Sequence, residues 1–138
     1  MPTIQAHIME GHSAGQKERL IASLTDAVVE TIDAPINSVC VLIDEVPRAH
    51  FGFAGKAATA DTAPRAVLQA FLIAGRTDAQ KVRLIEGLTA AVAESIGVDP
   101  GIVRVFIADL PNTDFGLGGK TALALGRGIG RAALVQHN

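Results

Sequence analysis

The sequence contains an internal duplication, and this repeat constrains the fold more than any other feature. When the chain is shifted by 64 residues, positions 2–60 align with positions 66–124 without a gap, and 24 of the 59 pairs are identical. At 138 residues the chain is long enough for one ordinary domain or two very small ones. We expect a single domain made of repeat one (2–60), a linker (61–65), repeat two (66–124) and a C-terminal arm (125–138).

Both repeats predict the same order of elements: a strand, a helix and a second strand. An apolar run (3–9 or 67–73) leads through a glycine to Ser13 or Thr77, and each of these is followed three positions later by glutamine. This is the capping-box pattern of a helix start. Apolar residues then recur at helical spacing as far as Asp33 and Gly97. A β-branched run follows in each copy, centred on residues 39–43 and 103–107.

Two strand-helix-strand units predict an α/β (α+β) fold, in which a four-stranded sheet carries two helices on one face. A helical crossover makes the two strands of a repeat parallel and its connection right-handed. Leu42 and Phe106 fall on the sheet face turned away from the helices, and no further long helix is available to cover that face. We therefore expect an oligomer in which these bare sheet faces pack together, with residues 125–138 as an arm that ties subunits together.

Composition excludes several classes of function. The net charge is −2 and no basic stripe is present, so nucleic acid is not an expected partner. No apolar run is long enough to span a membrane and the N-terminus has no leader pattern, so we expect a cytoplasmic protein. The single Cys40 cannot form an internal disulfide. No His, Cys or carboxylate spacing suggests a metal, and no phosphate-loop motif suggests a nucleotide, so we expect neither a metal nor a cofactor.

Further motifs occur in order in repeat one, and the Gln-Lys and Phe-Gly-x-x-Gly motifs recur at matching positions of repeat two. A proline follows Met1, the first strand ends in Glu-Gly, the helix opens with Gln-Lys, and the second strand closes with Glu-x-Pro before His-Phe-Gly-x-x-Gly. Together these motifs resemble the 4-oxalocrotonate tautomerase family, over residues 2–60 and again over 66–124 without the proline. The two-copy length resembles the fused members of that family. The resemblance implies a homotrimer, in which three chains form a hexamer-like body.

The resemblance also implies roles for individual residues. Pro2 would be the general base once Met1 is removed, while Arg76 and Arg104 would bind the substrate, and Phe51 and Phe115 match the family's aromatic residue. Pro2 lies in repeat one and both arginines in repeat two, so Pro2 would work beside arginines from a second half, of the same or a neighbouring chain. One complete site per chain would result. An inert second site would hold Ala66, His12 and Cys40.

Structural interpretations of the same residues stay open. Arg76 fits a solvated turn, Arg104 fits an ion pair across an interface, and the two phenylalanines fit a core. His12, His50 and Asp114 fit exposed loops as well as contacts to substrate. Cys40 fits a small buried apolar residue. The carboxylates at the strand ends fit a solvated surface; they are Asp44, Glu45 and Asp109.

The function that the resemblance implies is that of a cofactor-independent isomerase, which converts a small unsaturated 2-hydroxy acid into its 2-oxo form. An alternative is a hydratase, dehalogenase or decarboxylase, which needs a carboxylate in the pocket, and Asp114 is the only obvious one. A second alternative is a non-catalytic assembly protein that keeps the fold. Retention of Met1 would favour this last reading, because it would turn the Pro2 amine into an amide.

Overall fold

The computed structural model describes residues 1–128, and in it each repeat forms the predicted strand, helix and strand. Repeat one contains β1 (Thr3–Met9), α1 (Ala14–Ile32) and β2 (Cys40–Val46). Repeat two contains β5 (Ala66–Ile73), α2 (Asp78–Ile96) and β6 (Arg104–Leu110). A short hairpin follows each second strand: β3 (Gly52–Phe53) with β4 (Lys56–Ala57), and β7 (Gly116–Leu117) with β8 (Lys120–Thr121). Most of the expected C-terminal arm, residues 129–138, lies outside the described residues.

The helix ends follow the sequence signals. Both capping boxes are present: Ser13 accepts a hydrogen bond from the Gln16 backbone, Thr77 accepts one from the Gln80 backbone, and each glutamine side chain accepts from the capping residue's N–H. The residues that follow the two helices, Asp33 and Gly97, adopt left-handed backbone conformations with φ of 54° and 70°. Glycine is the residue best suited to that conformation, so the end of α2 is the less strained of the two.

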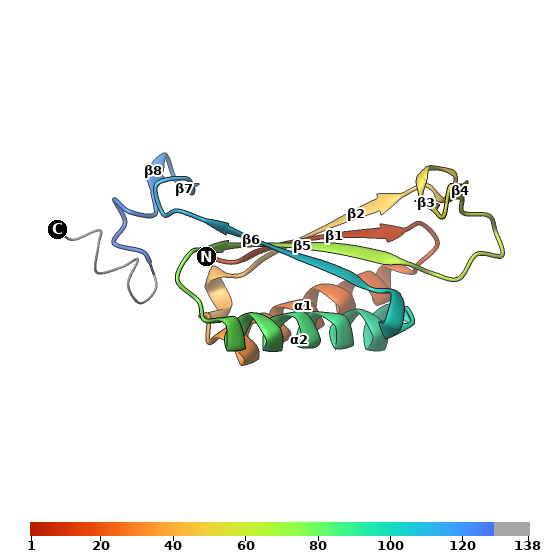
Figure 1. Cartoon of the computed structure of the whole chain (residues 1–138), viewed down its shortest axis with the longest axis horizontal. Coiled ribbons are helices and arrows are strands. Elements are labelled where there is room, and N and C mark those ends of the chain that lie inside the picture. The colour runs from red at the N-terminus through yellow and green to blue at the C-terminus, as the bar shows by residue number, and fades with distance from the viewer. Residues whose placement is uncertain (129–138) are drawn as a thin grey trace.

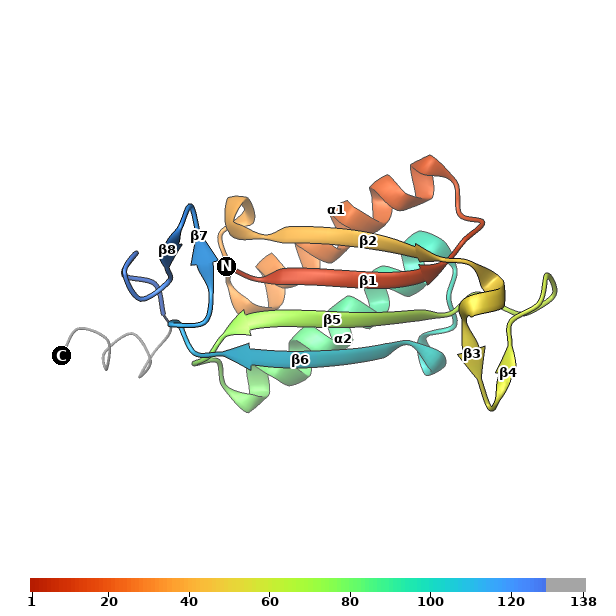
Figure 2. The same cartoon turned by 90° about the horizontal axis from the view of Figure 1, so that it is seen from above.

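The four long strands form one mixed sheet in the order β2-β1-β5-β6. The strands are parallel within each repeat, as the helical crossovers require, whereas β1 and β5 are antiparallel. Both helices cover the same face of this sheet (Figure 1). The two hairpins lie at opposite ends of the strands (Figure 2). The fold is therefore the expected four-stranded sheet with two helices on one face, with the repeats related by an approximate twofold rotation.

One hydrophobic core lies between the sheet and the helices. Alternate residues of the two central strands point into it, which matches the period of a strand with one covered face. They meet apolar residues that recur at helical spacing on both helices. The largest fully buried members are Ile4, Ile8, Leu20, Leu24, Val28, Leu68, Leu72, Leu84, Leu88 and Val92.

The other face of the sheet stays open within the chain. Leu42 in β2 and Phe106 in β6 are 54% and 55% exposed. Along residues 1–128 both long helices lie on the opposite face (Figure 1). The prediction that these two side chains face away from the helices is thus confirmed. None of the helices in this part of the chain is long and apolar enough to cross a membrane.

Candidate active site

The antiparallel contact between β1 and β5 gives the sheet two ends with different residues. Thr3 pairs with Phe71, so the start of β1 lies beside the end of β5. We call this the Pro2 end. At the other end Ile8 pairs with Ala66, and we call this the Ala66 end. Each end combines residues from both repeats, so their chemistry must be read separately.

Pro2 is buried at the start of β1, and its carbonyl accepts a 3.0 Å hydrogen bond from the backbone N–H of Cys40. This bond continues the parallel ladder between β1 and β2, so it fixes the backbone of Pro2 against its neighbour. Cys40 is exposed. Its interpretation as a small buried residue is therefore wrong for the single chain, because β2 is an edge strand and the thiol is not covered by a helix.

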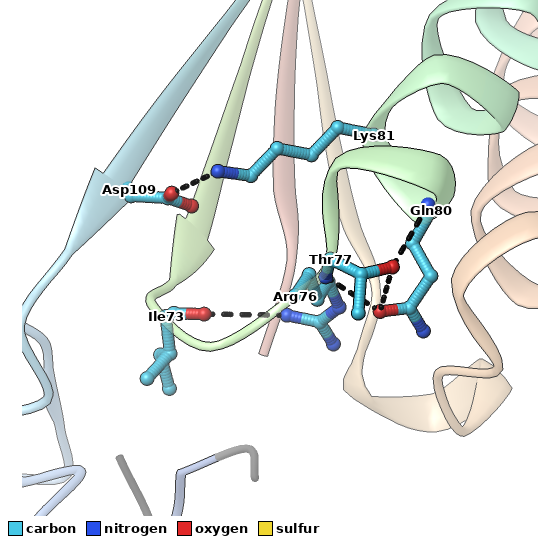
Figure 3. Close-up of polar contacts among 6 residues, drawn as sticks. All are labelled: Ile73, Arg76, Thr77, Gln80, Lys81 and Asp109. Atoms are coloured by element: carbon cyan, nitrogen blue, oxygen red, sulfur yellow. Dashed lines mark hydrogen bonds and ion pairs between the residues drawn. The ribbon is translucent and has the colours of Figure 1, made fainter. Parts of the chain in front are cut away.

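Arg76 lies at the same end, in the turn that joins β5 to α2. The Thr77–Gln80 capping box holds this turn, and Arg76 Nη1 donates to the carbonyl of Ile73 at 3.4 Å (Figure 3). The Arg76 Nε atom is buried without a hydrogen-bond partner among residues 1–128. Burial also lowers the pKa of the Arg76 guanidinium, although the nearby Asp109 opposes this shift. A buried donor without a partner suits a residue that receives a ligand oxygen.

The chain terminus reaches this arginine. The pKa of the Met1 amine is lowered from 8.0 to about 6 by burial, then by the positive charges of Arg76 and Arg127. Met1 borders two cavities. One, of about 330 Å³, is lined by Arg76, Gln80 and Arg127 among others. The second, of about 460 Å³, is lined by Cys40, Phe115 and Arg127 among others. An amine at this place is therefore held close to its neutral form at pH 7.

Arg127 is a candidate site residue that the sequence reading missed. It lies in the unrepeated segment after repeat two, where no partner position drew attention to it. The buried Asn112 donates to the Arg127 carbonyl at 2.9 Å, and the Arg127 N–H donates to the carbonyl of Ala122 at 2.8 Å. These bonds hold its backbone beside the terminus. The Pro2 end thus carries two cations, Arg76 from repeat two and Arg127 from the segment that follows it.

Arg104 does not join Pro2 within the chain. It opens β6 opposite Val67, which in turn pairs with His7. The strand residues from Pro2 to His7 span about 17 Å, so Arg104 lies at the Ala66 end. Phe51 lines a cavity with Arg104, whereas Phe115 lines one with Met1. The structure therefore divides the four predicted substrate-binding residues into two pairs, one at each end.

The remaining predicted residues lie outside the Pro2 end or outside its cavities. His12 precedes α1 at the Ala66 end, and its pKa is lowered by burial and by Arg48 and Lys17, against the raising effect of Glu45. His50 is exposed in a short 3-10 turn, and Asp114 is exposed and accepts a hydrogen bond from its neighbour Thr113. Neither His50 nor Asp114 lines a cavity described above.

The carboxylates at the strand ends are exposed, as expected, and each also contacts a basic side chain. Glu45 pairs with Lys17, Asp109 with Lys81 (Figure 3), and Asp44 contacts His7 Nδ1 at 3.0 Å. Both lysines are the second residue of the Gln-Lys motif, so the repeat carries this contact in both copies. Within residues 1–128, no group of three or more His, Cys, Asp or Glu residues could hold a metal ion. The charged groups described above at the Pro2 end are the terminal amine, Arg76 and Arg127.

Comparison with known proteins agrees with both the repeat and the fold. The family model described as tautomerase enzyme matches residues 2–61 and 68–123. A 2-hydroxymuconate tautomerase of Stutzerimonas stutzeri is 48% identical over 60 residues, which cover 44% of this chain and 95% of that protein. This relative therefore has the length of one repeat.

Solved structures match the whole two-repeat chain. A native fused 4-OT is 47% identical with a TM-score of 0.86, covering 91% of this chain and 99% of that one. A fused 4-OT described as a wild-type asymmetric trimer has the same identity and coverage and a TM-score of 0.83. Pt0534, solved after inactivation by 2-oxo-3-pentynoate, is 36% identical with the same coverage and a TM-score of 0.84. The chain belongs to the tautomerase family of isomerases, as a fused member that carries two copies of the family's β-α-β unit.

Proposed function

We propose that this protein is a cofactor-independent tautomerase that converts an unsaturated 2-hydroxy acid into its 2-oxo form, with the Pro2 amine as general base. One observation carries the proposal: Met1, whose removal would free the Pro2 amine, is half-buried near Arg76 and Arg127, and burial and these charges lower the pKa of the Met1 amine to about 6. A base that is neutral near pH 7, and whose conjugate acid still donates a proton, is what such a reaction needs. The relative named 2-hydroxymuconate tautomerase supports this substrate class.

The proton balance closes without any other reagent. Once Met1 is removed, the secondary amine of Pro2 takes the proton of the substrate's 2-hydroxyl group as that C–O bond becomes a carbonyl. The resulting ammonium returns a proton to a carbon of the conjugated chain. General acid–base catalysis of this kind contributes roughly 10²–10⁴-fold to the rate. The hydrogen bond from Cys40 to the Pro2 carbonyl keeps the amine in place during both transfers.

The arginines supply the electrostatic part. A guanidinium binds carboxylate through two parallel N–H groups and keeps its charge at every relevant pH. Arg76, with its unpartnered Nε atom, binds the carboxylate or the developing dienolate oxygen in this proposal. Arg127 borders both cavities and takes the part expected of a second arginine. Arg104 can contribute to a Pro2 site only from a neighbouring chain, because its own chain places it at the Ala66 end.

We also propose that three chains assemble into a trimer. Support comes from the open sheet face that exposes Leu42 and Phe106, since an apolar sheet face of this kind is normally covered. The fused 4-OT relative described as a trimer has the same two-repeat architecture. Neighbouring chains would then border each Pro2 end.

The alternative function, that of a hydratase, dehalogenase or decarboxylase, is not supported by the position of Asp114. That carboxylate was the obvious group to activate water, but it does not line either cavity beside Met1. The non-catalytic alternative depends on Met1 and is separated by experiment.

The test begins with the intact mass of the purified protein, which shows whether Met1 is absent. Mature protein is assayed with 2-hydroxymuconate and then treated with 2-oxo-3-pentynoate. The conjugated alkyne of this reagent accepts a neutral amine by addition, without a leaving group. We expect loss of activity together with the added mass of one reagent per chain, mapped to the N-terminal peptide. The Pro2→Ala variant should lose at least about 10²-fold in kcat/KM.

Two outcomes would count against this function. Full activity of Pro2→Ala would remove the prolyl amine from the mechanism. Retention of Met1 with no activity would favour the assembly-protein reading. The control variant is Ala66→Pro, which places a proline at the equivalent position of repeat two but inside the chain, without a free amine. It should not create a second reactive group.

A further inference from the structure

The cavity beside Met1 has a counterpart at the other end of the sheet. Shifting its lining residues by the 64-residue repeat gives Arg65 for Met1, Arg104 for Cys40, Phe51 for Phe115 and Phe53 for Leu117. Those four counterparts line one cavity of about 380 Å³ at the Ala66 end. The duplication has therefore produced two related cavities, and only one of them borders the chain terminus.

The second cavity differs from the first in its charge. The terminal amine and the thiol of the Pro2 end are both replaced by guanidinium groups. The Arg65 Cζ atom lies 3.8 Å from the centre of the Phe53 ring, and the Arg104 Cζ atom lies 6.0 Å from the same centre. Two permanent cations thus converge on one aromatic ring at the edge of this cavity.

These two cations lack an acidic partner. The lining of the cavity contains no Asp or Glu. In the described part of the chain, neither Arg65 nor Arg104 forms a salt bridge. Cation–π contact compensates each charge only by about 0.5–2 kcal/mol. Both guanidinium groups line one cavity and lie within 6.0 Å of one ring centre, and like charges repel each other. An anion bound between them would relieve this repulsion and gain charge-assisted hydrogen bonds.

Carboxylate fits this arrangement better than a nucleotide or a metal. Arginine forks match the planar carboxylate group, the cavity has the size of a small-molecule site, and Phe51 provides an apolar wall for a planar carbon chain. The cavity also lacks a base. Ala66 is buried, and its nitrogen is an internal peptide amide instead of a terminal amine.

We propose that the Ala66-end cavity is a second, non-catalytic binding site for a small unsaturated carboxylate, held by Arg65 and Arg104 against the phenylalanine wall. The site binds its ligand without converting it. The proposal depends only on the residues of this cavity, and it stands or falls separately from the role of Pro2.

The experiment measures binding of trans,trans-muconate, a planar dicarboxylate that has neither a hydroxyl nor a keto group, by isothermal titration calorimetry. The full chain is used with Arg76→Gln and Arg127→Gln in place, so that the Pro2 end has lost its two cations. Three further substitutions are added separately to this background: Arg65→Gln, Arg104→Gln and Phe53→Leu. The last introduces the residue found at the equivalent position of repeat two, Leu117. The matched control is Arg83→Gln, which removes one exposed arginine from α2. Circular dichroism of every variant checks that the fold is kept.

We expect one muconate per chain in the background variant, with an affinity at least about tenfold weaker after either Arg65→Gln or Arg104→Gln. Phe53→Leu should weaken binding less, and Arg83→Gln should leave it unchanged. The proposal is overturned if the background variant binds no muconate, or if Arg65→Gln and Arg104→Gln bind as tightly as Arg83→Gln. Tautomerase activity of Arg65→Gln in the otherwise unmodified chain reports on the Pro2 end separately and should stay near its normal level.

Discussion

Cys40 donates its backbone N–H to the carbonyl of Pro2, so the residue that repeat two replaces by Arg104 stands directly beside the proposed catalytic amine. Arg104 occupies the equivalent position at the other end of the sheet, where it pairs with Val67. Equivalent positions of the two repeats therefore carry different side chains, Cys40 at the Pro2 end and Arg104 at the Ala66 end. One end has the terminal amine and the Cys40 thiol, and the other has the Arg104 guanidinium and no amine.

Arg76→Gln and Arg104→Gln should differ in their effect on catalysis. We expect Arg76→Gln to lower kcat/KM by about 10²–10³-fold, because it removes a donor aimed at the developing negative charge. Arg104→Gln should cost less than about tenfold, because its chain places it at the far end. Steady-state kinetics with 2-hydroxymuconate measure both. An equal loss in the two variants would show that a neighbouring chain supplies Arg104 to the Pro2 site.

Arg127→Gln should raise the pKa of the terminal amine. The positive charge of Arg127 disfavours the ammonium form, so its removal makes protonation easier. In mature protein we expect the acid limb of the kcat/KM profile, where activity falls as the amine becomes protonated, to move to higher pH. Arg83→Gln on the outer face of α2 serves as the control and should leave this limb in place. If the acid limb stays at the same pH in Arg127→Gln, Arg127 does not act on the amine.

The same pKa makes stability depend on pH in protein that keeps Met1. The amine's pKa is about 6 in the folded chain, below its ordinary value of 8.0. Between these values the unfolded chain binds more protons than the folded chain, so the free energy of unfolding rises as the pH increases from 6 to 8. Urea unfolding across this range, with an N-acetylated protein as control, measures the effect. Identical slopes for the two proteins would contradict it.

Equivalent positions in the two hairpins offer a reciprocal stability test. Ala54 has φ of 52°, in the left-handed region that disfavours a side chain, whereas repeat two has Gly118 there with φ of 61°. An added Cβ at Gly118 would meet no atom within 4 Å, so any cost comes from the backbone alone. We expect Ala54→Gly to raise the free energy of unfolding by about 0.5–1 kcal/mol and Gly118→Ala to lower it by a similar amount. Urea unfolding at fixed pH measures both, and changes of the same sign would refute this explanation.

The open sheet face should control assembly. Leu42→Glu and Phe106→Glu together place charges on the face that we propose is covered in a trimer, and burial of unpaired charge is costly. We expect the variant to sediment as a smaller species than the unmodified chain. Val82, which is also 54% exposed but lies on α2, provides the control as Val82→Glu and should not change the oligomer. A monodisperse monomer for the unmodified chain would reject the proposed assembly.

Local signals in the sequence were sufficient to predict the helices and the four long strands. The Ser13 and Thr77 capping boxes, the helical spacing of residues such as Leu20 and Leu84, and the β-branched runs depend on neighbours a few residues apart, and the structure has the elements there. The same logic identified the face that carries Leu42 and Phe106. It misjudged Cys40, because exposure depends on which strand lies at the edge of the sheet. It placed the strand-end carboxylates on the surface correctly, but their ion pairs depend on which helix end lies opposite.

The sequence by itself determined that this chain is a duplicated strand-helix-strand unit of the tautomerase family. The first copy begins with Pro2, where the second has alanine, and only the second has arginine at positions 76 and 104. Only the tertiary structure decided which of those residues meet. Because β1 and β5 pair antiparallel, the start of one repeat lies beside the first turn of the other, which brings Arg76 to Pro2 and carries Arg104 away from it. The backbone of Arg127 is held by the Asn112 side chain and the Ala122 carbonyl, and no repeat pattern encodes these contacts.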